Sequence, residues 1–412
     1  MTVVAAPTAS RPLVAIACGG TGGHLFPGMA VGEELLRRGS DVTLLISPKE
    51  VDQQAVANER EMKVVTLPAV GMTHGKRIEF ISGFAKSYRG AKKLFRSRPP
   101  QAVLAMGGFT SAPPVLAGRA RGAATFLHES NAIPGRANRW LAHVVTQAFI
   151  GFPAAAGRLH HANILSTGTP VRPQFQPSDT GACRMSLGLE TRRPVLLVTG
   201  GSQGASGIND LLIAALPELT AALPDLQYIH LTGPNDTDKV RVAYDRHHCR
   251  AVVRPFLTEM ELALGAATAG VSRSGASSMA EFAAMRLPVI LVPYPTAADN
   301  HQLYNARCFV ETGAALLLEQ RSATAGELVS RVRQLVEDDA AQAAMREALQ
   351  RWEAPHAAEQ IAERILATVE ALSRGAWKQA SRARPGEPGN SRESRIGRGV
   401  ELSSIETHGA VL

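Results

Sequence analysis

The sequence predicts an α/β protein built from two doubly wound parallel sheets, one in each half of the chain. Apolar runs of strand length alternate with helix-like segments in both halves. One run in each half, residues 14–17 and residues 195–198, leads directly into a glycine-rich loop that opens a helical segment. The 412 residues, 45% of them hydrophobic and 19% charged, are too many for one comfortable core. Two globular domains are therefore expected.

The elements can be placed in order from the apolar periodicity. In the first half, strands are expected at residues 14–17, 42–46, 64–67, 102–105, 124–127 and 144–149. In the second half, they are expected at residues 195–198, 228–231, 252–254, 270–272, 289–292 and 315–318. Helical periodicity occupies residues 29–38, 208–223, 323–336, 341–352 and 357–372.

Two segments lack such periodicity. Residues 167–191 contain several prolines, which predicts an interdomain linker. Beyond residue 373 the chain is rich in Gly, Ser, Arg and Pro without an apolar face, so we expect a disordered tail.

Composition limits the class of function. The four cysteines lie far apart with no C-x-x-C pair, which is typical of neither a disulfide framework nor a zinc site. The first residues lack a signal-peptide core, and we expect the protein to remain in the cytoplasm. The net charge of +8 allows nucleic acid, an anionic membrane or an anionic substrate as partner. Because no nucleic-acid-binding motif is present, we expect no nucleic acid partner.

The two glycine-rich loops predict anion sites. Residues 19–24 read Gly-Gly-Thr-Gly-Gly-His and residues 200–204 read Gly-Gly-Ser-Gln-Gly. Glycines let the backbone approach a ligand, and the N–H groups of the next helix favour a phosphate. Neither loop has a Walker lysine, and Ser47 and Pro48 follow the second strand where a dinucleotide site has an acidic residue. A phosphorylated substrate, and no nucleotide cofactor, is therefore expected between the two lobes.

Polar residues at other strand ends add candidate groups. Glu281 lies about one and a half turns into a helix that follows residues 273–275, where a carboxylate suits ribose hydroxyls or simply the helix dipole. His128 and Glu129 lack a third ligand, so no metal site is predicted. His24 is the best candidate for a general base, since an imidazole can titrate near neutrality, although a structural hydrogen bond is the alternative.

Residues Lys76 to Arg98 can form an apolar stripe with basic residues spread around it. The apolar members are Phe80, Ile81, Phe84, Tyr88 and Phe95. The pattern fits a membrane-surface helix, or a crossover helix packed on its own sheet with a solvated basic rim. The first interpretation predicts docking to an anionic membrane surface.

Seven motifs occur in an order that resembles the MurG family of bacterial peptidoglycan glycosyltransferases. They lie at residues 19–24, 106–109, 128–131, 168–172, 200–205, 273–276 and 299–302. The resemblance spans residues 13–372. It implies two Rossmann-like domains of the GT-B type with the active site in the cleft between them, and no metal or other cofactor. It also implies inverting transfer of N-acetylglucosamine from UDP to the C4 hydroxyl of undecaprenyl-diphosphate-linked N-acetylmuramoyl-pentapeptide.

The resemblance also implies roles for particular residues. On the donor, these would be Ser202 and Arg172 with the diphosphate, Ala276 at a nearby helix start, Leu257 with uracil, Glu281 with ribose, and Gln302 and Asn131 with the sugar hydroxyls. Thr21, Gly22, Gly23 and His24 would border the reacting sugar and the acceptor diphosphate. Thr169 and Phe109 depart from the Asn and Tyr that are usual in the family.

The family fold implies a division of the chain. Residues 1–168 would form the acceptor- and membrane-side domain, 169–192 the linker and 193–354 the UDP-sugar-binding domain. Residues 355–372 would return to the first domain, and 373–412 would be the tail. We expect a peripheral enzyme on the cytoplasmic face of the bacterial inner membrane. The alternatives are a GT-B enzyme for another lipid-linked acceptor, or a non-catalytic nucleotide-sugar or nucleic-acid binder.

Overall fold

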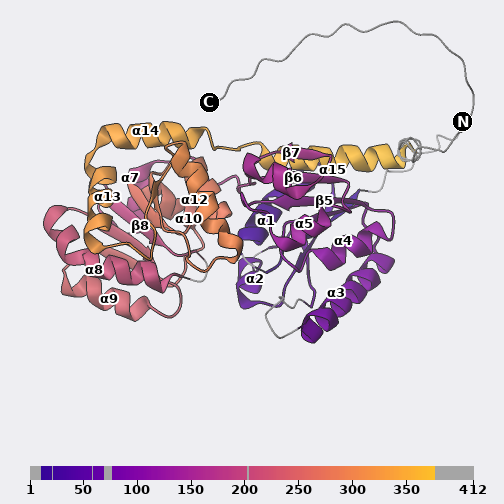
Figure 1. The fold of residues 1–412 in the computed structure, drawn as a ribbon, viewed down its shortest axis with the longest axis horizontal. Coiled ribbons are helices and arrows are strands. Elements are labelled where there is room, and N and C mark those ends of the chain that lie inside the picture. Colours follow the sequence, from indigo (N-terminus) through magenta and orange to yellow (C-terminus); the bar gives the residue numbers. More distant parts are fainter. Residues whose placement is uncertain (1–10, 21, 58, 69–76, 202–203, 376–412) are drawn as a thin grey trace, which may run out of the picture. The chain divides into compact units, whose positions relative to one another are not determined.

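The computed structural model describes residues 11–20, 22–57, 59–68, 77–201 and 204–375 (Figure 1). The described residues up to Val369 form one compact unit that contains two separate parallel sheets. Thr21, Ser202, Lys76 and the expected tail from residue 376 onward lie outside the described residues, while Ser373 still belongs to the last helix. The predicted α/β class with two doubly wound sheets is confirmed.

The first sheet has seven strands in the order β3-β2-β1-β4-β5-β6-β7. Its strands are β1 (Leu13–Ala17), β2 (Asp41–Ile46), β3 (Lys63–Thr66), β4 (Ala102–Ala105), β5 (Ala124–Glu129), β6 (Gln147–Ile150) and β7 (Ile164–Ser166). The helices of this half are α1 (Gly22–Arg37), α2 (Glu50–Ala55), α3 (Arg77–Ser97), α4 (Ala112–Arg119), α5 (Arg136–Leu141), η1 (Pro153–Ala155) and α6 (Ala156–Leu159).

The second sheet has six strands in the order β10-β9-β8-β11-β12-β13. They are β8 (Val195–Thr199), β9 (Gln227–Leu231), β10 (Ala251–Arg254), β11 (Ala269–Ser272), β12 (Val289–Leu291) and β13 (Leu316–Leu317). The helices are α7 (Thr180–Ser186), α8 (Ser206–Ala222), α9 (Thr237–Arg246), α10 (Met260–Ala266), α11 (Ala276–Ala284), η2 (Ala298–Asn300), α12 (His301–Glu311), α13 (Ala325–Glu337), α14 (Asp339–Gln350) and α15 (Ala357–Ser373).

Both glycine-rich loops lie at the point where the strand order of their sheet reverses. In the first sheet the order turns between β1 and β4, and in the second between β8 and β11. The loops follow β1 and β8, whose side chains are entirely buried. Open α/β sheets bind ligands in the crevice outside the carboxyl ends of the strands at such a switch point. The topology therefore places an anion-binding loop in the crevice of each lobe.

Two strand predictions in the first half were inaccurate. The strand expected at residues 144–149 begins only at Gln147, because Val144 and Val145 still donate backbone hydrogen bonds to Leu141 at the end of α5. The edge strand β7 was not predicted at all. Its three residues are too few to produce a periodic signal.

Helices also differ from the sequence-based expectation in two places. Helix α1 begins at Gly22, seven residues before the expected start. Its first two turns contain glycines and a proline, which have low helix propensity, so the sequence did not indicate a helix there. The expected linker contains the helix α7, which Asp179 caps by accepting a hydrogen bond from the Ala182 N–H at 2.6 Å. Cys183 in α7 is buried in the core of the second lobe. That part of the segment therefore packs with the second sheet.

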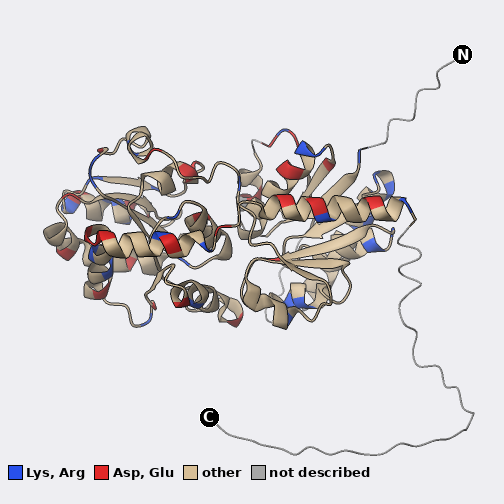
Figure 2. Ribbon diagram, turned by 90° about the horizontal axis from the view of Figure 1, so that it is seen from above, with Lys and Arg blue, Asp and Glu red and all other residues tan. Residues whose placement is uncertain are grey.

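Helix α15 carries the chain back to the first sheet. Arg38, which follows α1, donates hydrogen bonds to Glu359 and Glu363 of α15, each at 3.0 Å. Figure 2 shows acidic residues recurring along the exposed side of this helix. Its opposite face is apolar and buried through Ile361 and Ile365. No helix among the described residues is long and apolar enough to cross a bilayer.

Candidate active site

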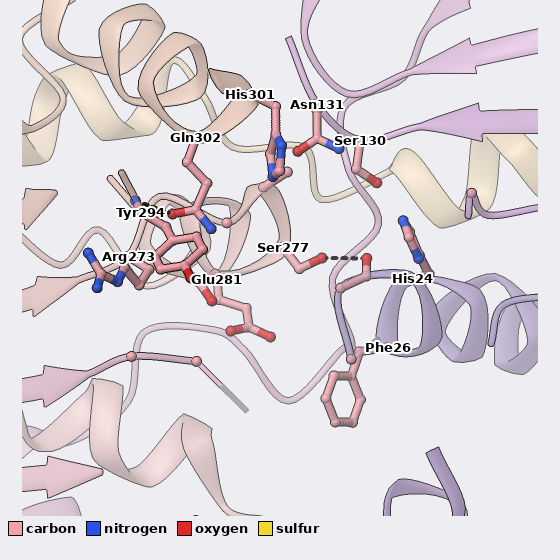
Figure 3. Close-up of a pocket in the computed structure, with 18 of the residues that line it drawn as sticks. His24, Phe26, Ser130, Asn131, Arg273, Ser277, Glu281, Tyr294, His301 and Gln302 are labelled. Atoms are coloured by element: carbon pink, nitrogen blue, oxygen red, sulfur yellow. Dashed lines mark hydrogen bonds between the residues drawn. The ribbon is translucent and has the colours of Figure 1, made fainter. Parts of the chain in front are cut away.

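One cavity of about 1190 Å³ collects residues that follow strands of both sheets (Figure 3). Gly22, Gly23 and His24 line it from the first glycine-rich loop, and Gly200 and Gly204 line it from the second. Eight further residues that the sequence analysis named also line this cavity. Asn131, Arg172, Leu257, Ala276, Glu281 and Gln302 line it, as do His301 and Phe109.

Hydrogen bonds join the two lobes at this cavity. The Ser277 hydroxyl in α11 donates to the Gly23 carbonyl at 2.8 Å, which Figure 3 shows as a dashed line. The Asn305 amide in α12 donates to Asn131 Oδ1 at 3.0 Å and accepts from the Ala132 N–H at 2.9 Å. Because Asn305 is fully buried, this bridge fixes the sequence-predicted Asn131 against the second lobe.

His24 lies in the first turn of α1 and rests against a second pair of glycines. A Cβ on Gly107 would lie 2.8 Å from His24 Nε2, and Gly107 and Gly108 have φ values of +119° and +74°. Both positions therefore require glycine, for space at the first and for backbone conformation at both. The motif at residues 106–109 forms the surface on which His24 rests.

The surroundings of His24 shift its pKa away from the ordinary imidazole value near neutrality. Loss of water around the imidazole lowers the pKa of His24 to about 4. The charge of Asp52 opposes that shift, while His301 and Lys49 add to it. His24 is therefore neutral at pH 7, the form that accepts a proton, and an anionic ligand beside it would raise its pKa again.

Asn131 is held by a buried carboxylate. Glu129 at the end of β5 accepts hydrogen bonds from the Asn131 N–H at 2.8 Å, the Gly135 N–H at 2.9 Å and the Asn138 amide at 2.9 Å. Its neighbour His128 is fully buried and lies 3.0 Å from the Gly168 carbonyl. Glu129 thus holds the loop that carries Asn131, and His128 connects the end of β5 with the segment after β7. Among the described residues, no group of three His, Cys, Asp or Glu side chains forms a metal-type cluster.

The second glycine-rich loop is packed too tightly for side chains at two positions. A Cβ on Gly204 would lie 2.4 Å from the Thr232 carbonyl, and one on Gly200 would lie 2.3 Å from the Ala205 N. Gly204 also has a φ of +72°. The described end of the loop leads directly into α8, and the N-terminus of a helix favours a phosphate.

The remaining donor-side residues line the second lobe's part of the cavity. Leu257 follows Phe256 after β10, and Ala276 begins α11. Loss of water around the carboxyl raises the pKa of Glu281 in α11 to about 7. Gln302 Oε1 accepts from the Tyr294 N–H at 2.9 Å, which leaves the amide nitrogen toward the cavity (Figure 3).

Arg172 brings a cation to the cavity from the segment that connects the lobes. Its guanidinium lies 4.8 Å from the ring centroid of Phe26 and 5.1 Å from that of Phe175. Its Nε is buried and has no hydrogen-bond partner among the described residues. Aromatic faces hold a guanidinium without using its donors, so Arg172 can offer them to an anionic ligand.

Several site residues were missed from the sequence or given no role. Arg273 is buried, donates to the Val292 and Pro293 carbonyls and stacks 5.4 Å from the Tyr294 ring. It therefore holds the loop that leads to Gln302. Asn305 and Ser277 were also missed, since only the approach of the two lobes gives them partners. No local sequence signal would have identified them.

Comparisons with known proteins agree with this architecture. Residues 14–150 match the glycosyltransferase family 28 N-terminal domain, and residues 195–363 match the C-terminal domain of the same family. The crystal structure of MurG from Acinetobacter baumannii superposes with a TM-score of 0.67 at 24% identity, over 86% of this chain and 99% of that one. This likeness concerns the fold.

Relatives with higher sequence identity align with this chain over nearly their whole length. A UDP-N-acetylglucosamine–N-acetylmuramyl-(pentapeptide) pyrophosphoryl-undecaprenol N-acetylglucosamine transferase of Desulforudis audaxviator is 36% identical over 85% of this chain and 97% of its own. The enzyme of the same name from Moorella thermoacetica is 35% identical over 87% of this chain and 99% of its own. With both glycine-rich loops of the fold in one cleft, the chain belongs to the MurG family of N-acetylglucosamine transferases.

Proposed function

We propose that this chain transfers N-acetylglucosamine from UDP to the C4 hydroxyl of undecaprenyl-diphosphate-linked N-acetylmuramoyl-pentapeptide, with inversion at the anomeric carbon. The observation that carries the proposal is the match to transferases of that name over 97% and 99% of their length. The family matches at residues 14–150 and 195–363 include both glycine-rich loops, which supports the proposal.

The second lobe binds the donor in this proposal. Glu281 accepts hydrogen bonds from the ribose hydroxyls, and the backbone at Leu257 contacts uracil. The second glycine-rich loop, which includes Ser202, and the start of α11 at Ala276 receive the diphosphate. All of these described residues line the same cavity, and oriented N–H groups at helix starts favour that charge.

The sugar is held from both lobes. Gln302 in α12 and Asn131 after β5 bind its hydroxyls, and the buried bridge through Asn305 supports this pairing. Gly22 and Gly23 with the neighbouring Thr21 border the sugar and the acceptor diphosphate. Ser277 holds the Gly23 carbonyl from the opposite lobe, which supports a reacting centre at this junction.

The chemistry needs a base and a way to stabilise the leaving group. His24, neutral at pH 7, takes the proton of the acceptor's C4 hydroxyl as that oxygen bonds to the anomeric carbon. The bond from the anomeric carbon to the diphosphate oxygen breaks with its electron pair on UDP. Arg172 and the N-termini of α8 and α11 stabilise the charge that develops there.

The acceptor's polyprenyl chain implies work at a membrane surface, and α3 is the proposed contact. Ile78 and Ile81 are exposed by 85% and 65%, and the exposed basic residue Lys86 lies on the same helix. Phe95, one of the expected docking residues, is 1% exposed in the core of the first lobe, so that assignment was wrong. Phe84 and Tyr88 pack partly on the same core. The proposed location is peripheral, on the cytoplasmic face of the inner membrane.

The proposed domain division follows the roles. Residues 1–168 serve the acceptor and the membrane, and residues 193–354 serve the donor. Residues 169–192 connect the two, and residues 355–372 return to the first domain. The packing of Cys183 in the second core supports counting α7 with the donor domain.

The test is transfer of radiolabelled N-acetylglucosamine from its UDP donor to lipid-linked muramoyl-pentapeptide by the full chain, with EDTA present. Labelled lipid product is expected, with the β configuration at the new bond. A parallel reaction uses an undecaprenyl-diphosphate carrying a different sugar as acceptor. Product only from that second acceptor would favour the alternative GT-B enzyme, and product from neither would reject the proposal.

A further inference from the structure

Asp52 is a buried carboxylate that none of the sequence motifs includes. It lies in α2, beneath the first glycine-rich loop, and its side chain is 0% exposed. Asp52 Oδ2 accepts hydrogen bonds from the Gly20 N–H at 2.6 Å and from the Ser47 hydroxyl at 2.5 Å. An ionised acceptor makes such bonds stronger than a neutral one.

These bonds belong to a set of contacts that hold the loop in place. Gly20 has a φ of +115°, and its carbonyl accepts from Lys49 Nζ at 2.8 Å. The Gly19 carbonyl accepts from the Thr110 hydroxyl at 2.7 Å. A Cβ on Gly19 would lie 2.3 Å from the Ser47 N, so the loop packs directly on the end of β2. Asp52 ties Gly20 and Ser47 together at that contact.

Asp52 also contributes the negative charge near His24. The charged and titratable groups that act on His24 are Asp52 of α2, Lys49 before it and His301 of α12 from the opposite lobe. His128 of β5 is coupled to His24 as well. Among these groups, only Asp52 favours the protonated imidazole.

We propose that Asp52 is a positioning residue of the transfer reaction, which holds the first glycine-rich loop against the acceptor diphosphate and stabilises the proton that His24 takes up. The inference rests on the proposed function. It does not require Asp52 to touch either substrate, because the carboxylate is buried behind the Gly20 backbone. A single side chain thus links the shape of the loop to the basicity of the imidazole.

The test compares Asp52→Asn with the wild-type full chain at saturating UDP-N-acetylglucosamine. Loss of a charged hydrogen bond to Gly20 is expected to lower kcat/KM for the lipid acceptor about 10- to 100-fold. UDP affinity, measured by calorimetry, should remain that of wild type. Removing the negative charge lowers the pKa of His24, so the acid limb of kcat should move to lower pH.

Two variants separate the parts of the proposal. Thr110→Val removes the bond to the Gly19 carbonyl without changing a charge, so acceptor kcat/KM should fall while the pH profile stays in place. Glu50→Gln removes a carboxylate from the same helix that is exposed and bonds to Gln54, and it should behave as wild type.

The outcomes distinguish this inference from the proposed function. If the wild-type chain shows no transfer to the lipid acceptor, the proposed function fails first. If wild type transfers and Asp52→Asn matches it in acceptor kcat/KM or in the position of its acid limb, the role of Asp52 is overturned. Equal UDP affinity and melting temperature of the variants exclude misfolding as the cause of a loss.

Discussion

At the residue scale, His24 lies in the cleft, and its burial keeps the imidazole neutral at pH 7. His24→Ala is expected to lower kcat by about 10²- to 10⁴-fold, the usual loss for a general base. Binding of UDP should change little, since the donor residues Leu257 and Glu281 lie in the second lobe. Steady-state transfer rates and calorimetry with UDP check the two parts. A variant with near-normal turnover across pH would assign His24 a structural role only.

Glu281 gives a second residue-scale prediction, which depends on pH. Its pKa of about 7 means that the carboxyl is partly protonated at neutral pH, while the ionised form accepts both ribose hydroxyls better. UDP affinity should therefore rise as the pH increases from 6 to 8. Glu281→Ala should weaken binding by about 1–3 kcal/mol.

The control for this prediction is Glu281→Gln, which cannot ionise. UDP has its own titrating phosphate, and that contribution is common to both proteins. Calorimetry at several pH values should show a steeper dependence for wild type than for Glu281→Gln. Parallel curves of UDP affinity against pH would show that ionisation of Glu281 does not affect donor binding.

At the scale of a single element, the two halves of α3 lie in different environments. Its second half is anchored in the core through Ala91 and Phe95, and its first half exposes Ile78 and Ile81. The exposed basic residues Lys86, Lys92 and Lys93 lie on the same helix. Each Lys or Arg near an anionic surface contributes about 1 kcal/mol. The combined variant Lys86→Glu, Lys92→Glu and Lys93→Glu should therefore sediment less with anionic vesicles, and wild type should be released by salt.

A matched control changes the same charge elsewhere. Lys239, Arg241 and Arg246 lie on α9 of the second lobe, and replacing all three by Glu gives an equal change in net charge. That control should sediment nearly as wild type, and both triple variants should still bind UDP. Equal losses in the two variants would show that net charge, and not α3, determines vesicle binding.

At the scale of the whole molecule, the two chain crossings between the lobes meet at Gly168. This residue follows β7, and Ala354 precedes α15 on the return crossing. A Cβ on Gly168 would lie 2.2 Å from the Ala354 Cβ, and its φ is +78°. Gly168→Ala should therefore lower the free energy of unfolding by about 2–4 kcal/mol through overpacking and backbone strain.

Gly188→Ala is the control for the backbone term. Gly188 has a φ of +74° but no heavy atom within 4 Å of its would-be Cβ, so only strain of about 1–2 kcal/mol is expected. Urea denaturation of the two variants gives the comparison. If Gly168→Ala lowers the free energy of unfolding no more than Gly188→Ala does, the contact between the two crossings does not contribute to stability.

The sequence by itself determined the two parallel sheets, both glycine-rich loops and the family, because these depend on local periodicity and contiguous motifs. Strands such as β4 were predicted to the residue, since a fully buried parallel strand is one uninterrupted apolar run. The three-residue β7 and the glycine-led start of α1 were not predictable on that basis.

Only the tertiary structure decided the properties that depend on distant segments. The pKa of His24 is set by burial against Gly107 and by charges from α2 and α12, which lie far away in the sequence. Phe95 and Ile81 share one amphipathic pattern, yet the core covers the first and leaves the second exposed. Asp52 and Asn305 have no motif, and their partners come from other elements. Desolvation and electrostatic interaction act through space, so such roles appear only when the chain is folded.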